Sequence, residues 1–302
     1  MLGSRSVEKA EQWTKEFGLD AFGNYDDVLN NDNLDAVYIS LPPNLQAEWS
    51  VKAADSGKHI LCEKTAAVSF EKAKKMVDTA RTSKVRILEA FAFRFHPQHK
   101  KFRELTKNDT VGEISVFEGK FGLVRTDLNG FRFDKNLGGG ALNDAGCYPV
   151  CASRMVLESE PIGVSSNLLF DKEKSVDMQG SFYFIYPNNK SAFGSFGYSN
   201  FYQSTYSVWG SKALMGLKRA YAIKPNTNSF IWINSDDGYR EIEILWVDQS
   251  KIMIDEFSQV IKKEKEASFN YENDLLVQAK SMEAIRISNS EKRFVTLDEI
   301  KF

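Results

Sequence analysis

The first ninety residues alternate between two patterns of apolar positions, and the alternation predicts helices and strands in turn. Residues 34–43 and 85–93 are short apolar runs of the kind that buried parallel strands use. Residues 6–18 have a serine cap, an early glutamate and a closing glycine, which predicts a helix, and residues 44–57 and 69–83 show similar signals. Strand–helix–strand repetition at this spacing predicts parallel βαβ units with right-handed crossovers.

The second half has a different rhythm, because segments rich in Phe, Tyr, Ile and Val follow one another with hairpin turns between them. Turn residues gather at 186–192 and 234–240. We expect one large open sheet, antiparallel or mixed, followed by two closing helices at 250–266 and 272–288. The predicted strands are residues 113–124, 162–170, 178–186, 190–199, 204–210, 213–219, 229–234 and 239–247.

Length and composition narrow the class of protein. A chain of 302 residues has room for two domains, each with its own core. The formal net charge of −2 gives no electrostatic case for nucleic acid or an anionic membrane. No apolar run approaches the ~18 residues of a membrane helix. The three cysteines, Cys62, Cys147 and Cys151, exclude a full disulfide set and favour a cytoplasmic location. Cys147 and Cys151 are four positions apart, but no histidine lies near them, so a zinc site is not expected.

The opening of the sequence lacks a feature that nucleotide-binding domains of this kind normally have. Such domains begin with a strand, a Gly-rich turn and a helix whose N-terminus holds the pyrophosphate. Residues 1–6 look instead like the end of a second strand, and the glycines at 138–140 follow no apolar strand. Three explanations stay open: the first unit was lost, the gene starts roughly 30 to 40 residues upstream, or the protein works without it. We therefore expect the chain as written to bind cofactor poorly.

Ser4 and Arg5 bear on which cofactor would bind. At the tip of a second strand, an acidic residue suits a ribose 2′-hydroxyl, whereas arginine and hydroxyl groups suit a 2′-phosphate. These two residues therefore favour NADP over NAD. The alternative is that Ser6 only caps a helix and Arg5 is a solvated charge.

A lysine follows the predicted buried strand in "HILCEK", residues 59–64. Ligands of open α/β sheets bind beyond the carboxyl ends of the strands. Lys64 can therefore reach a ribose hydroxyl and a substrate oxygen, and can lower the pKa of a nearby phenol from about 10 toward neutrality. The alternative is an ordinary surface lysine. Other residues at these strand ends are expected to contact the cofactor: Leu41, Pro42, Asn44 and Glu63.

A second candidate stretch is "LGGGALNDAGCYPV" at 137–150, where a helix is predicted from Ala141 onward. Asp144 and Tyr148 are four positions apart and would share one helix face. A tyrosine hydroxyl can give a proton to a ketone oxygen, and an aspartate can hold neighbouring sugar hydroxyls. Pro149 predicts a kink. The alternative is that both side chains serve only helix and packing.

Four segments, "AVYISLPP", "GKHILCEK", "FAFRFHPQHKKFRELTKNDTVGEI" and "LGGGALNDAGCYPV", together resemble the glucose-fructose oxidoreductase/inositol dehydrogenase family. The resemblance is collinear from Met1 to about residue 160 and weaker beyond. It implies an α/β protein in which an incomplete Rossmann-type parallel sheet domain, residues 1–95, precedes an α+β domain with a large open, mostly antiparallel sheet, residues 96–302. The active site would lie in the cleft between them.

The family's motifs map onto individual residues. Its Glu-Lys-Pro falls on Glu63, Lys64 and Thr65, and its Asp-x-Gly-x-His/Tyr falls on 144–148. Tyr148 at the last place is similar to the dihydrodiol dehydrogenase and NDP-sugar 3-ketoreductase branch. The resemblance implies hydride transfer between NADP (or NAD) and a sugar or sugar nucleotide, with Tyr148 as acid and base, Lys64 assisting and Asp144 beside them. Thr65 in place of proline, and Gln46 where many relatives have histidine, depart from the pattern.

The remaining expectations concern substrate and assembly. Arg94 and His96 follow the strand at 85–93 and are expected to contact substrate, with a locally bonded histidine as the alternative for His96. An open sheet leaves an apolar face that we expect to pair in a homodimer or tetramer. An aldose or trans-dihydrodiol dehydrogenase, a non-catalytic sensor and a truncated gene product stay open as other interpretations.

Overall fold

A small parallel sheet forms the first part of the fold. The computed structural model describes residues 1–124 and 129–301. Strands β3 (Ala36–Ile39), β4 (His59–Glu63) and β5 (Ile87–Ala90) lie in the order β3-β4-β5, all parallel. Helices α3 (Pro43–Asp55) and α4 (Phe70–Thr82) connect them, as the apolar patterns predict. All four residues of β5 are buried, and three of them are apolar, as expected for a strand covered on both faces.

The chain begins with a separate parallel pair. Strand β1 (Leu2–Gly3) pairs with β2 (Phe22–Gly23), with α1 (Val7–Phe17) between them and α2 (Tyr25–Leu29) after them. Ser6 caps α1 by accepting a hydrogen bond from the Lys9 amide, so the predicted cap is present. A cavity of about 460 Å³ lies between this pair and β3, and apolar and aromatic side chains form most of its wall.

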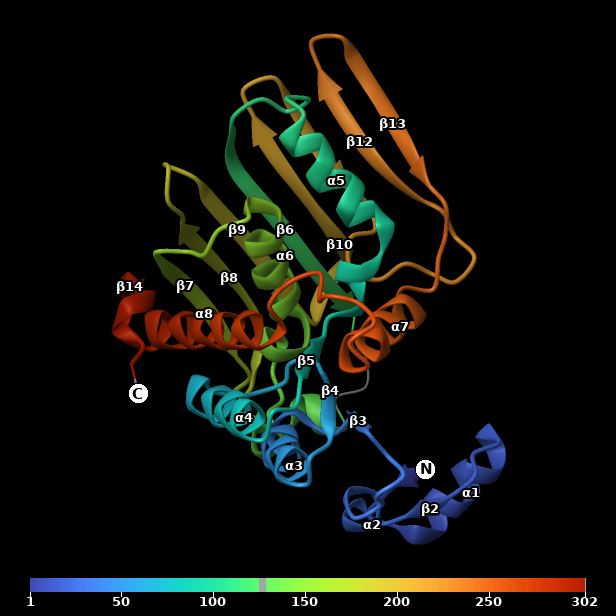
Figure 1. Ribbon diagram of the computed structural model, residues 1–302. Helices are drawn as coiled ribbons and strands as arrows, with labels where there is room; N and C mark the ends of the chain where they lie inside the picture. Colours follow the sequence, from blue (N-terminus) through green and yellow to red (C-terminus); the bar gives the residue numbers. More distant parts are fainter. Residues whose placement is uncertain (125–128, 302) are drawn as a thin grey trace.

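A nine-stranded sheet dominates the second part (Figure 1). Its order is β13-β12-β11-β10-β6-β9-β8-β7-β14, and every pairing is antiparallel except β6 with β9. The predicted open, mostly antiparallel sheet is thus confirmed. The strands are β6 (Ile114–Val124), β7 (Gly163–Phe170), β8 (Asp177–Ile185), β9 (Ser191–Gly197), β10 (Ser199–Gly210), β11 (Ala213–Leu217), β12 (Ser229–Ser235), β13 (Gly238–Ile244) and β14 (Val295–Thr296).

Helices gather on one face of this sheet (Figure 1). Helix α6 (Cys147–Leu157) packs on β6, and the long α8 (Tyr271–Glu291) packs on β7 and reaches back to β5. Helix α7 (Gln249–Ile261) completes the predicted closing pair. Helix α5 (Pro97–Lys107) was not predicted, although it has a proline at its start, a His96 cap and buried Phe102 and Leu105. The segment is rich in charged residues and has only a narrow apolar stripe, so the apolar pattern did not indicate a helix.

Short helical turns link the two parts. Turn η1 (Ala92–Phe95) follows β5, and η2 (Phe131–Phe133) and η3 (Lys135–Leu137) precede the glycine cluster. A π-helical turn, η4 (Leu142–Gly146), leads into α6, and η5 (Leu297–Glu299) ends the fold. Pro149, where the sequence predicts a kink, lies in the first turn of α6, directly after this π-turn. Within the described residues, no helix combines the length and the apolar character that a bilayer span requires.

Candidate active site

A cavity of about 300 Å³ opens where the carboxyl ends of β3 and β4 face the glycine-rich segment. Its wall comes from three places: residues 40–46 after β3, Glu63 and Lys64 at the end of β4, and residues 131–144 together with Tyr198. The edge is the one at which ligands of parallel sheets bind. Segments far apart in the sequence therefore contribute to one recess.

Lys64 and Asp144 form the centre of this recess. The Lys64 Nζ donates to the Asp144 backbone oxygen at 2.7 Å and to its carboxylate Oδ1 at 3.1 Å. Arg132 Nε donates to the other carboxylate oxygen at 2.8 Å. The side chains of Lys64 and Asp144 are only 15% and 11% exposed, so their attraction is weakly screened. The carboxylate thus holds two cations in fixed positions.

Tyr148 lies next to Lys64 rather than in the cavity wall. Lys64 Nζ is 4.9 Å from the centre of the Tyr148 ring. Four aromatic rings, centred 4.8–5.7 Å away, fix the phenol: those of Phe91, Phe93, Phe121 and Tyr221. The ring remains partly exposed. Asp144 lies in the π-turn η4, and Tyr148 lies in the first turn of α6. The two residues therefore reach Lys64 from successive turns.

The electrostatics of the site follow from burial and from these contacts. Burial by itself acts to raise the pKa of Asp144, but Lys64 and Arg132 hold that pKa below its ordinary value. Burial acts to lower the pKa of Lys64, yet Tyr148, Cys147 and Asp144 together raise it, so the amine stays charged. Burial raises the pKa of Tyr148 to about 12, and Lys64 lowers it only in part. The prediction that Lys64 lowers the pKa of this phenol toward neutrality is therefore wrong for this structure, because the effect of burial outweighs the charge of Lys64.

The glycine cluster brings the two halves of the site together. Gly138 has a φ of +80°, and an added Cβ would lie 2.6 Å from Val68 and 3.0 Å from the Asn44 amide. Gly140 has a φ of +115°, and its Cβ would meet an Asp177 oxygen at 2.2 Å. No larger residue fits either position without strain. The loop can therefore press against the start of α3 on one side and β8 on the other.

Thr65, the departure from the family's proline, makes a contact that proline lacks. Its hydroxyl donates to the Asn143 backbone oxygen at 2.9 Å. Asn143 Nδ2 in turn donates to the Gly138 oxygen at 2.9 Å. The turn after Lys64 is thus tied directly to the segment that carries Asp144.

The expected cofactor-contacting residues have different surroundings. Leu41, Pro42 and Glu63 line the cavity with Lys64. The side chain of Asn44 is engaged elsewhere. Its Nδ2 donates to the Asn136 backbone oxygen, and its Oδ1 accepts from Lys72 Nζ. Gln46 also lines the cavity, and its Nε2 donates to the Leu41 oxygen at 2.7 Å.

Ser4 and Arg5 follow β1, in the two-stranded sheet, and neither lines this cavity. The Ser4 hydroxyl accepts from the Ser6 amide at 3.3 Å, and Arg5 is exposed. Their place at the carboxyl end of a parallel strand is the place the sequence predicts, and their role in choosing NADP stays a prediction.

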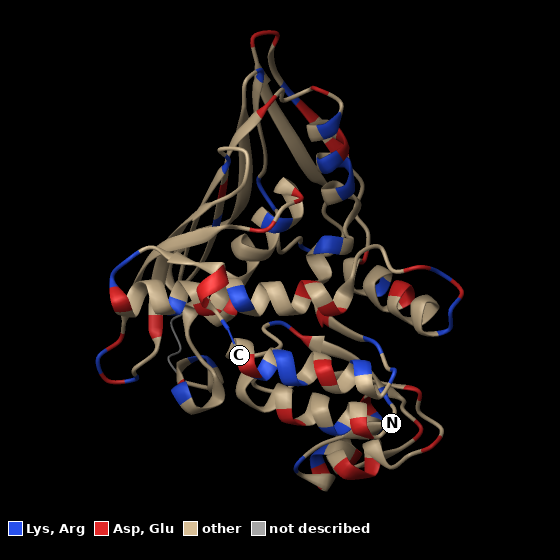
Figure 2. Ribbon diagram, turned by 60° about the vertical axis from the view of Figure 1, so that its left-hand side comes forward, with Lys and Arg blue, Asp and Glu red and all other residues tan. Residues whose placement is uncertain are grey.

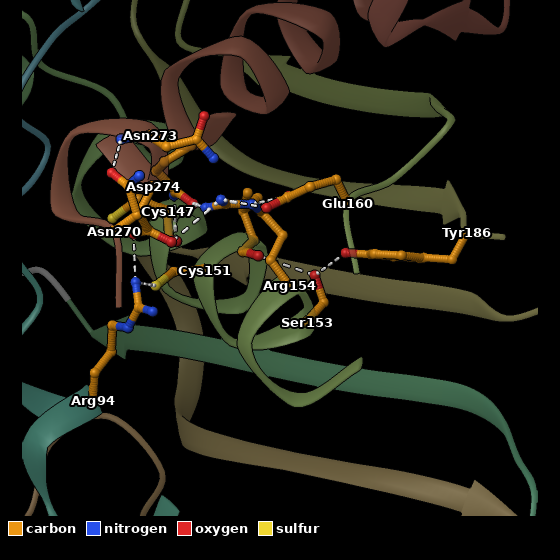
Figure 3. Close-up of polar contacts among 12 residues, drawn as sticks. Arg94, Cys147, Cys151, Ser153, Arg154, Glu160, Tyr186, Asn270, Asn273 and Asp274 are labelled. Carbon is orange, nitrogen blue, oxygen red and sulfur yellow. Dashed lines mark hydrogen bonds and ion pairs between the residues drawn. The ribbon is translucent and has the colours of Figure 1, made fainter. Parts of the chain in front are cut away.

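The structure does not bring Arg94 and His96 to the cavity. Arg94 pairs with Asp274 (Figure 3). Its guanidinium stacks on Phe269 at 3.7 Å, and the residue borders a different cavity of about 700 Å³. His96 is 1% exposed and caps α5, its Nδ1 accepting from the Gln98 amide. Burial lowers the pKa of His96 to about 4, so its ring is neutral. For His96 the structure matches the local-bonding alternative.

Arg132 and Tyr198 are among the cavity residues that the sequence reasoning missed. Arg132 stands between two phenylalanines ahead of the glycine cluster, and this lone charge in an aromatic segment was the available signal. Tyr198 follows β9 and donates to the Gly140 oxygen at 3.1 Å. Burial and the nearby Asp144 raise the pKa of Tyr198. No signal marked Tyr198, because aromatic residues in strands usually indicate packing.

Comparison with protein-family models covers most of the chain. Residues 1–91 match the model of an oxidoreductase family described as having an NAD-binding Rossmann fold. Residues 99–215 match the model of a GFO/IDH/MocA C-terminal domain.

Individual relatives are similar over much of their length. A dTDP-3,4-didehydro-2,6-dideoxy-alpha-D-glucose 3-reductase from Saccharopolyspora spinosa is 29% identical over 86% of this chain and 79% of its own. A D-xylose 1-dehydrogenase (NADP(+)) from Haloferax volcanii is 36% identical, over 52% of this chain and 48% of its own. The crystal structure of a 3-ketoreductase from Actinomadura kijaniata with NADP and TDP-benzene has a TM-score of 0.90 at 27% identity, covering 95% of this chain and 88% of that one.

Proposed function

Because this chain belongs to the GFO/IDH/MocA oxidoreductase family, we propose that it transfers hydride between NADP and a sugar or sugar nucleotide. The substrate carbon would be a ketone in one direction and a secondary alcohol in the other. One observation carries the proposal: Lys64 and Asp144, which are 80 positions apart, meet at 3.1 Å with Tyr148 beside them.

Each side chain has a distinct task in this proposal. The Tyr148 phenol gives its proton to the carbonyl oxygen as the carbon is reduced, and takes it back in the reverse direction. Its raised pKa keeps it protonated at neutral pH, which suits reduction. The Lys64 ammonium stabilises negative charge on that oxygen. Asp144 and Arg132 fix the position of the ammonium.

The position of two residues in one relative supports the pair. Solved structures of the Actinomadura kijaniata 3-ketoreductase include one with a single tyrosine replaced and others with a single lysine replaced. Those two residues are separated by the same number of positions as Lys64 and Tyr148. The matching separation supports the assignment of Lys64 and Tyr148 as a functional pair.

In this proposal the cavity holds one end of a nicotinamide dinucleotide. Leu41 and Pro42 provide an apolar wall, and Lys64 and Glu63 provide a donor and an acceptor for ribose hydroxyls. When bound, the nicotinamide ring supplies or accepts the hydride. Ser4 and Arg5 would favour the 2′-phosphate of NADP over NAD.

The test has a binding arm and a turnover arm. Titration of the purified chain with NADPH, followed by quenching of tryptophan fluorescence, should saturate. Oxidation of NADPH should then require a keto-sugar or a keto-deoxysugar nucleotide from a panel. Absence of saturable binding would refute the proposal, and so would saturable binding without turnover on any member of the panel.

A second candidate of the same class is an aldose or trans-dihydrodiol dehydrogenase working in the oxidative direction. The similarity to a D-xylose dehydrogenase favours it. The same panel separates the two, because the dehydrogenase would reduce NADP⁺ with xylose or a dihydrodiol and would ignore keto-sugar nucleotides.

We also propose that the chain is cytosolic and forms a homodimer through the outer face of the nine-stranded sheet. All three cysteines are free and buried. In Figure 2 the charged residues lie mostly on helices and turns, while the large sheet is largely uncharged. Trp209 and Phe193 are 64% and 47% exposed, and they border a trough of about 740 Å³. An apolar surface of this kind typically marks an interface.

Replacing Trp209 with glutamate should convert the dimer to a monomer, because the interface would have to bury a charge. Sedimentation equilibrium measures the mass. Trp13→Glu is the matched control, since Trp13 is 44% exposed on α1, away from this sheet. A wild-type chain that sediments as a monomer would contradict the dimer.

A further inference from the structure

Two hydrogen bonds hold the segment that follows Lys64. On one side, the Thr65 hydroxyl donates to the Asn143 oxygen at 2.9 Å. On the other, the Ala66 amide donates to the carboxylate Oε1 of Glu89 at 2.9 Å. Glu89 is thus a side-chain link between this segment and strand β5.

Glu89 is an unusual residue for its position. It lies in the middle of the buried strand β5, directly opposite Cys62 of β4, and is only 5% exposed. A carboxyl group at such a place loses its hydration and costs stability unless polar groups compensate. Neither the apolar pattern of the strand nor the proton transfer assigned to Tyr148 requires it.

We propose that Glu89 is a positioning residue for Lys64, whose carboxyl group holds the Ala66 amide and thereby fixes the direction in which Lys64 leaves the sheet. Lys64 must point toward Asp144 and the Tyr148 ring, and Ala66 is two residues away on the same turn. With Glu89 in place, the turn is anchored to β5 as well as to Asn143. This inference rests on the proposed function for the meaning of Lys64, but the contact itself does not.

The surroundings make Glu89 responsive to pH. Burial raises the pKa of Glu89 to about 8, and the Ala66 amide acts against that rise. The charged groups that face it belong to the network in Figure 3: Asp274 adds to the rise, whereas Arg154 and Arg94 oppose it. The neighbouring thiols, of Cys62, Cys147 and Cys151, have raised pKa values themselves and stay neutral. An ionised acceptor polarises an amide more strongly than a neutral one.

The contact can be observed directly in the full chain without cofactor. In a sample labelled with ¹⁵N-alanine, the Ala66 amide resonance should shift with a midpoint near pH 8. In Glu89→Gln the shift should be absent, because the amide oxygen accepts but does not ionise. An Ala66 amide resonance that keeps its wild-type position in Glu89→Leu, where no acceptor remains, would overturn the assignment of the contact.

Kinetics test the positioning role. Glu89→Gln retains an acceptor, so kcat should stay within about threefold of wild type, and any inflection of kcat near pH 8 should vanish. Glu89→Leu has a similar volume and no acceptor, so kcat should fall by about 10- to 100-fold with KM nearly unchanged. Ile87→Val, on the same buried strand, is the control and should behave as wild type.

The outcomes separate the possible failures. If Glu89→Leu keeps full kcat, or if Glu89→Gln loses as much as Glu89→Leu, the positioning role is overturned. If Glu89→Leu does not fold, the kcat of Glu89→Gln as a function of pH still tests the positioning role. An inflection near pH 8 that persists in Glu89→Gln would overturn it. A wild-type chain inactive on every sugar, or Lys64→Met at full activity, would contradict the proposed function while leaving the Ala66 titration intact.

Discussion

Tyr148→Phe should lower kcat by about 10²- to 10⁴-fold, the range that a positioned general acid contributes. The substitution removes only the hydroxyl, and the four surrounding rings still hold the phenyl group. Folding and cofactor binding should therefore be unchanged, and KM should move little. Steady-state consumption of NADPH with the best substrate of the panel measures both constants.

Lys64→Met should cause a loss of similar size, because the ammonium stabilises the oxygen to which the proton is delivered. The double variant should lose much less than the product of the two single effects, since the residues act as a unit. Tyr239→Phe and Lys74→Met are matched controls, as both side chains are exposed and away from the cavity. Retention of a third or more of kcat by Tyr148→Phe would remove it from the mechanism.

Asp274→Asn should lower the free energy of unfolding by about 3–5 kcal/mol, as breaking a buried ion pair does. Asp274 pairs with both Arg94 and Arg154, and Arg154 Nη2 is 3.3 Å from its Oδ1 (Figure 3). The two guanidinium side chains are 10% and 3% exposed. Asparagine cannot neutralise them, and Arg94 would have no carboxylate partner among its described contacts.

The same network supports the active site from behind. Arg154 Nη1 donates to Gln278 Oε1 at 3.1 Å, and Gln278 Nε2 donates to the Cys147 backbone oxygen at 2.9 Å. Cys147 directly precedes Tyr148. The network therefore joins α8 to the turn of α6 that presents the phenol, which explains why so much charge is buried there.

Urea denaturation at neutral pH measures the loss, with Asp255→Asn as control. Asp255 is 52% exposed in a surface pair with Lys251, so its replacement should cost under about 1 kcal/mol. Burial acts to raise the pKa of Asp274, but Arg94 and Arg154 hold it below the ordinary value. The contribution is thus complete above about pH 4, and is lost as pH falls through the lowered pKa. Equal losses for the two variants at pH 7 would contradict the buried-pair account.

Local patterns were sufficient for most of the elements and for part of the site. The apolar runs of the first half predicted β3 and β5, and the serine caps predicted α1 and α4, because these signals act within a few residues. Helix α3 was also predicted, although it begins at Pro43 with no side-chain cap. The apolar run before Lys64 predicted that this lysine lies at the edge of the sheet where ligands bind. The spacing of Asp144 and Tyr148 predicted a shared helix face, although a π-turn and an α-helix present them in the structure.

Other parts could not be predicted because they depend on what lies nearby in space. Arg132 and Tyr198 reach the cavity only through the course of a loop and the end of a strand. Arg94 and His96 seemed well placed after β5, but one pairs with Asp274 on α8 and the other caps α5. The pKa of Tyr148 was expected to fall, and burial among four aromatic rings raises it instead.

Chemical groups, their order along the chain and the period of apolar residues are properties of the chain before it folds. They were enough to indicate a parallel sheet and an open antiparallel sheet, and the resemblance to a known family added the pairing of Lys64 with Tyr148. Distance, burial and net electrostatic environment arise only when segments far apart in sequence pack together. Folding therefore decided that Lys64 meets Asp144, that Thr65 bonds to Asn143, and that a buried glutamate, Glu89, stands behind the turn that carries the lysine.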